Sequence, residues 1–473
     1  MHRCFLSAAV AALVAASAGA AENPALTIYR ADSDALFENT PSPVTEGYAV
    51  VHESRALKIS DGRQTLVIDG LPAALDAEAV SIDLGAGSRV LAQRVLSIGE
   101  GGALAAHRGE KIAISLRAGG LQGTLLGIND GALIVRDDAS SQIVYVHEYD
   151  TLRFTQGSGL PGSTLQLVAD AKAGDITAAL TYPTSGLGWR AAYSASLLDG
   201  GACRMRLDAL ASIANRSGRD YGSSTLKLVA GSPNIARQGG GPRVYAAKAM
   251  MAAAPEALPQ QAALGDYRSY AIDGTLDLPD ASVTQVPLYA ARELDCQRLW
   301  IFENNGAYFP PKPTLAPDVG LGAAPIQSYL RFMTSENLPA GNLRVLTRDH
   351  DGHSEFLGEA RIGDIQKGHD VTVALGIPFD LSANRERTAF SIDKAAHEMN
   401  EGFRITLANS GETARTVTVR EHPNRWRGWS LMSSSQKPSK QTPDTLEFEV
   451  AVPANGKATL DYAVKYAWTP KDE

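Results

Sequence analysis

The residues best suited to chemistry lie in one short segment, 349–353, with the sequence Asp-His-Asp-Gly-His. Imidazoles and carboxylates at this density are typical ligands of Zn²⁺ and other divalent ions, so His350, Asp351 and His353 are candidate metal ligands. The same segment has the composition of a hairpin turn, because Asp-Gly is a preferred turn dipeptide and apolar residues stand on both sides of it. The sequence favours the turn and leaves the metal site open.

Four aromatic residues are candidates for binding another molecule. Tyr308 and Phe309 precede a proline-rich run, and loops on a rigid scaffold are where binding residues usually lie. Trp426 and Trp429 could stack on sugar rings, although at least one of the two indoles is expected to pack between sheets instead.

The motifs of common enzyme classes do not occur in the sequence. It contains no phosphate-binding P-loop, no G-x-S-x-G nucleophile elbow, no C-x-x-C and no complete H-E-x-x-H. Residues 186–191 match G-x-G-x-x-A, but an alternating strand pattern follows them, so no helix N-terminus is expected there to hold a pyrophosphate. We therefore predict no catalytic residue and no cofactor.

The elements that would position these residues are predicted to be strands. Short runs alternate apolar and polar residues throughout the chain, and Gly, Asp and Asn interrupt them every ten or so positions. Asn455-Gly456, between the alternating segments 448–452 and 460–464, predicts a hairpin. Helix is expected only in short pieces near 246–257 and 392–400. The predicted fold class is mostly β.

Four regions follow from these patterns. Residues 1–20 are a leader, and 21–105 form an N-terminal β region. Residues 106–158 contain five short strands with Gly-bearing turns, which suits a small SH3-like or Sm-like barrel. Residues 159–468 are expected to form an immunoglobulin-like β-sandwich region, interrupted by two long Gly/Pro/Ala-rich loops at 237–264 and 304–325.

Composition and charge exclude several classes of protein. The chain has 473 residues, of which 44% are hydrophobic and 20% charged, so a collagen-like, disordered or coiled-coil chain is excluded. The formal net charge is −8, and therefore no strong cationic field attracts nucleic acid or anionic lipid.

The N-terminus predicts export. A short basic start, an apolar run over residues 4–16 and the small residues Ala18-Gly19-Ala20 form a secretory signal peptide, with cleavage expected after Ala20 or Ala21. The apolar run is shorter than the ~20 residues that span a bilayer, and no later segment is apolar enough to do so. We expect an exported protein, in the periplasm first and at the outer surface or secreted as alternatives.

Two cysteines, Cys203 and Cys296, remain after the leader is removed. Both lie in predicted strands and could meet in a sandwich core, and an oxidising compartment lets a disulfide between them persist. The alternative is two separate buried thiols that act as small apolar side chains.

The order of the segments resembles bacterial exported proteins that carry the domain of unknown function 4139, relatives of the mucoidy-inhibitor group. The shared segments run through nearly the whole mature chain: residues 26–29 (LTIY), 71–76 (LPAALD), 186–193 (GLGWRAAY), 215–218 (NRSG), 226–231 (LKLVAG), 338–341 (LPAG), 356–359 (FLGE), 375–380 (LGIPFD) and 460–462 (LDY). The stretch 237–264 and the residues just before Val283 depart from the pattern. The resemblance implies an exported β-rich protein and brings no reaction, ligand or catalytic residue with it.

Two functions from different classes remain. The first is a non-enzymatic module of the bacterial envelope that binds an unidentified envelope protein or a cell-wall polymer through Tyr308, Phe309, Trp426 and Trp429. The second is a metal-assisted hydrolase built on His350, Asp351 and His353, with His369 or His422 brought in as a further ligand. The sequence favours the first, and a stoichiometric metal ion would favour the second.

Overall fold

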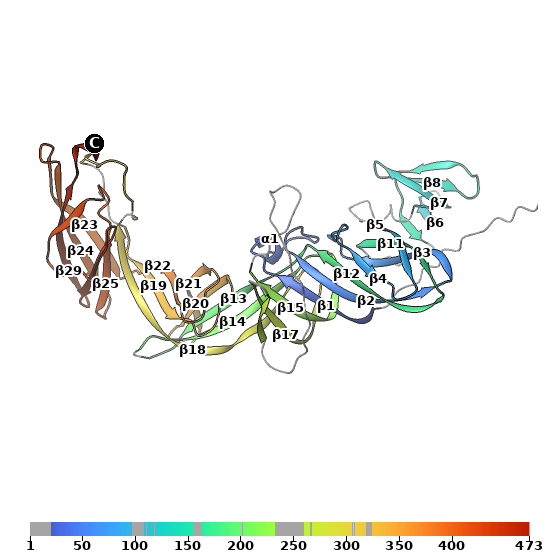
Figure 1. Ribbon diagram of the computed structural model, residues 1–473, viewed down its shortest axis with the longest axis horizontal. Coiled ribbons are helices and arrows are strands. Elements are labelled where there is room, and N and C mark those ends of the chain that lie inside the picture. The colour runs from blue at the N-terminus through green and yellow to red at the C-terminus, as the bar shows by residue number, and fades with distance from the viewer. Residues whose placement is uncertain are drawn as a thin grey trace, which may run out of the picture. The chain divides into compact units, whose positions relative to one another are not determined.

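The computed structural model (Figure 1) describes residues 20–96, 108–109, 111–117, 119–154, 162–200, 202–231, 260–264, 267–304, 306, 308–317 and 324–472. Strands make up 65% of the described residues and helix 2%, so the predicted mostly-β fold is confirmed. Among the described residues, no helix has the length and apolarity needed to cross a bilayer. The signal peptide predicted over residues 1–20 lies almost wholly outside the described residues.

The chain divides into two compact units, Met1–Ala191 with Leu210–Ala290 and Ala192–Ala209 with Ala291–Glu473. The first unit holds β1 (Ala20–Tyr29), α1 (Asp34–Phe37), β2 (Ala49–Ile59), β3 (Gly62–Leu71), β4 (Ser81–Asp83), β5 (Arg89–Leu96), β6 (Lys111–Leu116), β7 (Gly119–Asn129), β8 (Ala132–Asp137), β9 (Ile143–Val146), β10 (Thr151–Phe154), β11 (Ser163–Ala171), β12 (Gly174–Thr184), β15 (Tyr221–Ala230), β16 (Gln260–Leu264) and β17 (Tyr267–Leu278). Three further strands supply residues to both units: β13 (Leu187–Leu197), β14 (Arg204–Asn215) and β18 (Ser282–Asn304).

The main sheet of the first unit has seven strands in the order β16-β17-β15-β1-β2-β12-β4. Its N-terminal strand β1 is internal, parallel to β15 and antiparallel to β2. Leu26 and Ile28 alternate with polar or partly exposed neighbours and are buried, which is the pattern of a strand packed on one face. A three-stranded sheet, β3-β11-β5, belongs to the same unit.

The five strands expected within residues 106–158 are all present and form one sheet in the order β10-β6-β7-β8-β9. Ile112, Ile114, Leu125, Leu133 and Val135 make its small core, with Val146. In the described residues β9 and β10 are the two edges of an open sheet, so the closed barrel was not a correct prediction. Both edge strands have only four residues, and they do not pair with each other.

The second unit contains the remaining strands. They are β19 (Gln327–Met333), β20 (Gly341–Arg348), β21 (Ser354–Ile362), β22 (Asp370–Gly376), β23 (Leu381–Asp393), β24 (Glu398–Asn409), β25 (Arg415–Glu421), β26 (Trp429–Ser434), β27 (Lys440–Gln441), β28 (Leu446–Val452) and β29 (Gly456–Ala467), followed by the short 3-10 helix η1 (Pro470–Asp472).

A β-sandwich forms the C-terminal part of this unit, as the sequence predicted. The sheet β23-β24-β29-β26 faces a second sheet in which β18, β25, β28 and β27 are neighbours. Inward residues of both sheets form one core, among them Phe302, Phe403, Val417, Phe448 and Tyr462. We call this part the C-terminal sandwich.

Several predicted details differ from the structure. Asn455-Gly456 does not close a hairpin, because β28 and β29 belong to opposite sheets and the turn crosses between them. The helix expected at 392–400 is instead the β23–β24 turn, where Asp393 accepts hydrogen bonds from the backbone N–H groups of Ala395 and Ala396. The helix expected at 246–257 lies outside the described residues.

Two predicted boundaries also differ. The loop expected over 237–264 ends in a strand, since β16 pairs with β17, while its part up to residue 259 lies outside the described residues. Regions 21–105 and 159–468 are not separate units, because β3 pairs with β11 and β2 pairs with β12. Long-range strand pairing leaves no local mark in the sequence, and these boundaries rested on local pattern alone.

Candidate binding site on the C-terminal sandwich

A cluster of charged residues is buried at one side of the C-terminal sandwich. Glu401 on β24 occupies an inward position between Met399 and Phe403, and it is almost completely buried. Arg425, in the segment between β25 and β26, is 1% exposed, and its Nε lies 2.8 Å from Oε1 of Glu401. Arg387 on β23 lies 3.8 Å from the same oxygen. We call these three residues the Glu401 cluster.

The buried position of the Glu401 carboxylate disfavours its charged form. Burial raises the pKa of the Glu401 carboxyl, and the nearby charges of Arg425 and Arg387 offset only part of that effect. Two arginines therefore share one carboxylate that burial disfavours, which leaves their remaining N–H groups to other acceptors.

Those other acceptors belong to the proline-rich loop between β18 and β19. Nη1 of Arg425 donates to the backbone oxygens of Thr314, at 3.1 Å, and Ala316, at 2.7 Å. The backbone N–H of Thr314 donates in return to the Arg425 carbonyl at 2.9 Å, and Arg387 donates to the Pro317 carbonyl. Leu315 packs against the sandwich core. The Glu401 cluster thus fixes the backbone of residues 314–317 to the sandwich.

The same loop exposes two of the aromatic residues that the sequence singled out. Tyr308 is 62% exposed and Phe309 is 40% exposed. Pro310, Pro311 and Pro313 follow them, and proline fixes the backbone φ angle of each of these positions. A large aromatic surface is therefore presented to solvent by a segment with little conformational freedom, and we call residues 308–317 the aromatic loop.

A second ion pair lies beside the first. Arg385 on β23 forms two-pronged hydrogen bonds with Glu421, at 2.9–3.1 Å, and its guanidinium lies 3.7 Å from the centroid of the Phe403 ring. The Tyr462 hydroxyl donates to Glu421 Oε2 at 2.6 Å, and burial raises the pKa of Tyr462 well above its usual value. This pair has satisfied hydrogen bonds and a structural role.

A recess of about 290 Å³, open space at its mouth included, lies between the two ion pairs. Its lining includes Arg385, Glu401, His422 and Tyr466, and its enclosed space of about 10 Å³ has room for about one water molecule. His422 is engaged on both ring nitrogens, 2.8 Å from Glu303 Oε1 and 2.7 Å from the Asp444 carbonyl. The recess is too small for a substrate, and its polar groups hold one another.

The two tryptophans proposed as sugar-stacking residues do not form an exposed pair. Trp426 is 3% exposed and belongs to the sandwich core, so it is not a binding residue. Trp429 is partly buried against the same core, and its indole N–H donates to the Pro443 carbonyl at 2.6 Å. Trp426 lies in the bent segment before β26 and Trp429 is the first residue of β26, so the two indoles do not share one face of a strand.

The segment 349–353 forms the tip of the β20–β21 hairpin. Asp349 Oδ1 accepts hydrogen bonds from the backbone N–H groups of Asp351 and His353, at 2.9 and 2.8 Å. Potential ligand atoms of Asp349, Asp351 and His353 lie within 4.8 Å of one another, whereas His350 instead contacts Asp351 at 3.2 Å. Among the described residues, neither His369 nor His422 joins this group.

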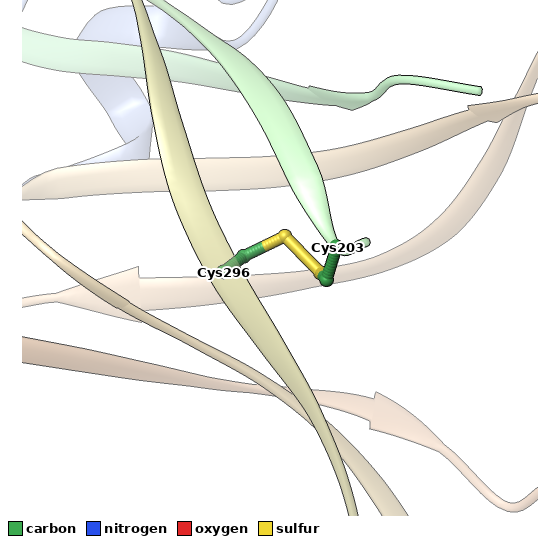
Figure 2. The surroundings of a disulfide bond; sticks show 2 residues. All are labelled: Cys203 and Cys296. Atoms are coloured by element: carbon green, nitrogen blue, oxygen red, sulfur yellow. A yellow bond between two sulfur atoms is a disulfide. The ribbon is translucent and has the colours of Figure 1, made fainter. Parts of the chain in front are cut away.

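Cys203 and Cys296 form a disulfide in the structure (Figure 2). Cys203 immediately precedes β14 and Cys296 lies on β18, with Cα atoms 5.0 Å apart and a sequence separation of 93. The backbone N–H of Cys296 also donates to the Cys203 carbonyl at 2.9 Å. The bridge therefore joins two strands that the backbone already pairs.

One buried polar cluster was missed at the level of sequence. In the first unit, Glu53 accepts hydrogen bonds from Arg55, Arg219 and the hydroxyl of Tyr182, at 2.8–3.2 Å. A signal was present in the sequence, because Glu53 and Arg55 occupy the same inward face of β2 as Val51 and Leu57. Charged residues at such positions need partners, and that need could have marked them.

Residues 178–470 match the model of a family described as a domain of unknown function (DUF4139). The chain belongs to this family. The matched region contains the aromatic loop, the Glu401 cluster and the hairpin tip. Trp189 and Tyr193, the family-like pair on β13, are both buried, and they donate to the carbonyls of Val229 and Pro339, at 3.0 and 2.8 Å. A search of curated proteins finds no match.

Proposed function

We propose that this chain is an exported, non-enzymatic protein of the bacterial envelope, and that it binds an envelope protein or a cell-wall polymer through its aromatic loop. The observation that carries the proposal is the exposure of Tyr308 and Phe309 on a segment whose backbone is fixed by Arg425 and Arg387. Tyrosine and phenylalanine supply much of the energy at binding surfaces, and a fixed loop loses little entropy when it binds.

Export is supported by the N-terminal signal sequence and by the cysteine pair. A disulfide persists in an oxidising compartment and is rare in a reducing one. Alkylation of the unfolded, unreduced protein isolated from cells, followed by intact-mass measurement, tests this part. We expect no alkyl group on Cys203 or Cys296, and two alkyl groups would contradict export to an oxidising compartment.

The binding surface is tested by photo-crosslinking in intact cells. A photoreactive residue in place of Tyr308 should give adducts that the same residue in place of Phe379 does not give, although Phe379 is 100% exposed in the same unit. Phe309→Ala should reduce the adducts. Retention of the purified protein on isolated cell wall, weakened by Phe309→Ala, would identify a polymer instead of a protein partner. Equal labelling at both positions, or neither adducts nor retention, would overturn the proposal.

A metal-assisted hydrolase is the second candidate, and the observation that favours it is the convergence of Asp349, Asp351 and His353. The hydrogen bonds of Asp349 to the turn give these residues a structural role as well. Metal analysis of the purified protein distinguishes the two functions. A stoichiometric ion that is present in the wild type and lost in His353→Ala would favour the hydrolase. Equal metal content in the wild type and the variant would favour the binding module.

A further inference from the structure

Two arginines of the C-terminal sandwich lie against the same tryptophan, and neither forms an ion pair with a carboxylate of the described residues. Arg298 on β18 and Arg415 on β25 lie two residues before the paired residues Trp300 and Val417 of these parallel strands. Because side chains alternate along a strand, both arginines lie on the same face as Trp300. Their guanidinium carbons are 6.0 and 4.5 Å from the centroid of the Trp300 ring.

The hydrogen bonds of this pair are incomplete. Arg298 Nη2 donates to the Ser328 hydroxyl at 3.2 Å, and Arg298 Nε is buried without a hydrogen-bond partner in the described part of the chain. Within that part, neither Arg298 nor Arg415 forms an ion pair. Other arginines of the same sandwich do find carboxylates: Arg385 contacts Glu421, Arg404 contacts Asp461 and Arg420 contacts Glu447.

This arrangement is electrostatically unfavourable as it stands. The positive charges of Arg298 and Arg415 repel each other. Burial and the charge of Arg415 both lower the pKa of Arg298. Since guanidinium stays protonated in proteins, the repulsion is relieved by a counter-charge and not by loss of a proton.

We propose that Arg298 and Arg415 bind an oxyanion, the phosphate or carboxylate group of a ligand. Planar guanidinium groups donate paired hydrogen bonds to oxyanions, and the terminal N–H groups of the partly exposed Arg298 and Arg415 side chains supply such donors. The Ser328 hydroxyl accepts from Arg298 and keeps its own hydrogen for an anion oxygen. Trp300 holds both guanidinium groups by cation–π contact, so the site is formed before the ligand arrives.

The site is accessible without being fully solvated. Arg298, Trp300 and Arg415 are all partly exposed, while Ser328, which pairs with Trp300 on the neighbouring strand β19, is buried. A partly desolvated pair of cations binds an anion more strongly than the same pair in bulk water. The site is independent of the aromatic loop, and either proposal can fail without the other.

The test is calorimetric binding of inorganic phosphate and of acetate to the purified full-length protein, at ionic strength held constant with chloride. We expect saturable binding of at least one anion and an affinity at least about tenfold weaker in both Arg415→Gln and Arg298→Gln, because each substitution removes a cation and its charge-assisted hydrogen bonds to the anion. Arg404→Gln removes an arginine that is already paired with Asp461, and should bind as the wild type does.

Two further results distinguish the ligands and control for misfolding. Binding of phosphate alone identifies a phosphate-bearing ligand, and binding of acetate alone a carboxylate-bearing one. Thermal unfolding without anion should show Arg415→Gln at least as stable as the wild type, since the substitution removes a repulsion. The absence of saturable binding by either anion, or unchanged affinity in both variants, would overturn the proposal.

Discussion

Glu53 and Glu401 are both buried glutamates that face arginines, yet their environments have opposite effects on their pKa values. Burial by itself would raise the pKa of Glu53, but the hydrogen bonds and charges of Arg219 and Arg55 outweigh it and lower the pKa. Burial prevails at Glu401, whose pKa is raised. The difference follows from what each arginine contacts. Arg219 donates to both oxygens of Glu53, whereas Arg425 forms an ion pair with one oxygen of Glu401 and its Nη1 donates to the carbonyls of Thr314 and Ala316.

The comparison separates two uses of a buried ion pair. The Glu53 cluster, made of Glu53, Arg55, Tyr182 and Arg219, joins β2, β12 and the segment before β15, and both oxygens of its carboxylate accept hydrogen bonds. The Glu401 cluster leaves its carboxylate with fewer hydrogen bonds and uses the arginines to hold an irregular backbone. A buried network in which the cations contact a loop is therefore evidence that the position of the loop matters.

The largest expected effect comes from breaking the Glu53 cluster. Glu53→Gln leaves Arg55 and Arg219 without their counter-charge, and we expect the free energy of unfolding of the first unit to fall by about 3–5 kcal/mol. Urea unfolding measures this as a lower midpoint. Glu78→Gln, at an exposed position, is the matched control, with an expected change within about 0.5 kcal/mol. Equal midpoints for the two variants would contradict the role of Glu53.

A smaller loss of stability is expected when the Glu401 carboxylate, whose charge burial disfavours, is removed. Glu401→Gln keeps an oxygen that can accept from Arg425 and removes a charge that burial disfavours, so we expect a loss of about 1–2 kcal/mol. The aromatic loop should also loosen, because Arg425 and Arg387 no longer have a fixed anchor. Limited chymotrypsin digestion should cut faster after Tyr308 in Glu401→Gln than in the wild type, since Pro310 protects the bond after Phe309 in both proteins. Unchanged cleavage would show that the cluster does not hold the loop.

The two clusters should respond to acid in opposite directions. The contribution of Glu53 is complete above its unfolded pKa of about 4.5 and is lost as the pH falls through its lower folded pKa, so the deficit of Glu53→Gln should shrink below pH 4.5. Because the folded pKa of Glu401 is raised, wild-type protein gains stability as the pH falls through that value. The deficit of Glu401→Gln should therefore grow as the pH falls toward 4.5. Urea midpoints from pH 7 to pH 4 measure both trends, and parallel trends would contradict the assignment.

The smallest expected effect on stability is at the tip of the aromatic loop. Phe309→Ala should change the free energy of unfolding by less than about 0.5 kcal/mol, because the loop is held by its backbone carbonyls and not by this side chain. Phe379→Ala is the matched control at a fully exposed position. A loss above about 1 kcal/mol from Phe309→Ala alone would show that Phe309 packs on the sandwich and is not free to bind a partner.

The sequence was informative where structure follows from neighbouring residues. Period-two alternation predicted the strands, and Asp351-Gly352 marked the tip of the β20–β21 hairpin. Asn455-Gly456 has the same turn signal, but there the chain crosses from one sheet to the other. In both arrangements the flanking apolar residues point into one core, so alternation cannot distinguish a hairpin from a crossing.

The candidate site shows the same limit. The exposure of Tyr308 and Phe309 follows from their place in a proline-rich loop, which is a local property. The partner that fixes the loop, Arg425, lies more than a hundred residues away in sequence, in a segment where Trp426 attracted the functional interpretation. Contacts between an arginine side chain and distant backbone carbonyls have no sequence pattern, so only the structure could reveal the anchor.

The position of β1 has a consequence for how the protein reaches its folded state. Ala25 pairs with Thr225, about 200 residues later in the chain, and the pairing continues to Tyr29 and Val229. A chain that crosses a membrane from its N-terminus therefore delivers an apolar strand long before the neighbour that completes its sheet. Such distant pairing makes folding slow and leaves a strand edge open to wrong partners in the meantime. The main sheet of the first unit cannot be completed until the chain up to about residue 230 is available, so under the proposed export its assembly would be timed by transport and not by synthesis of its first strand.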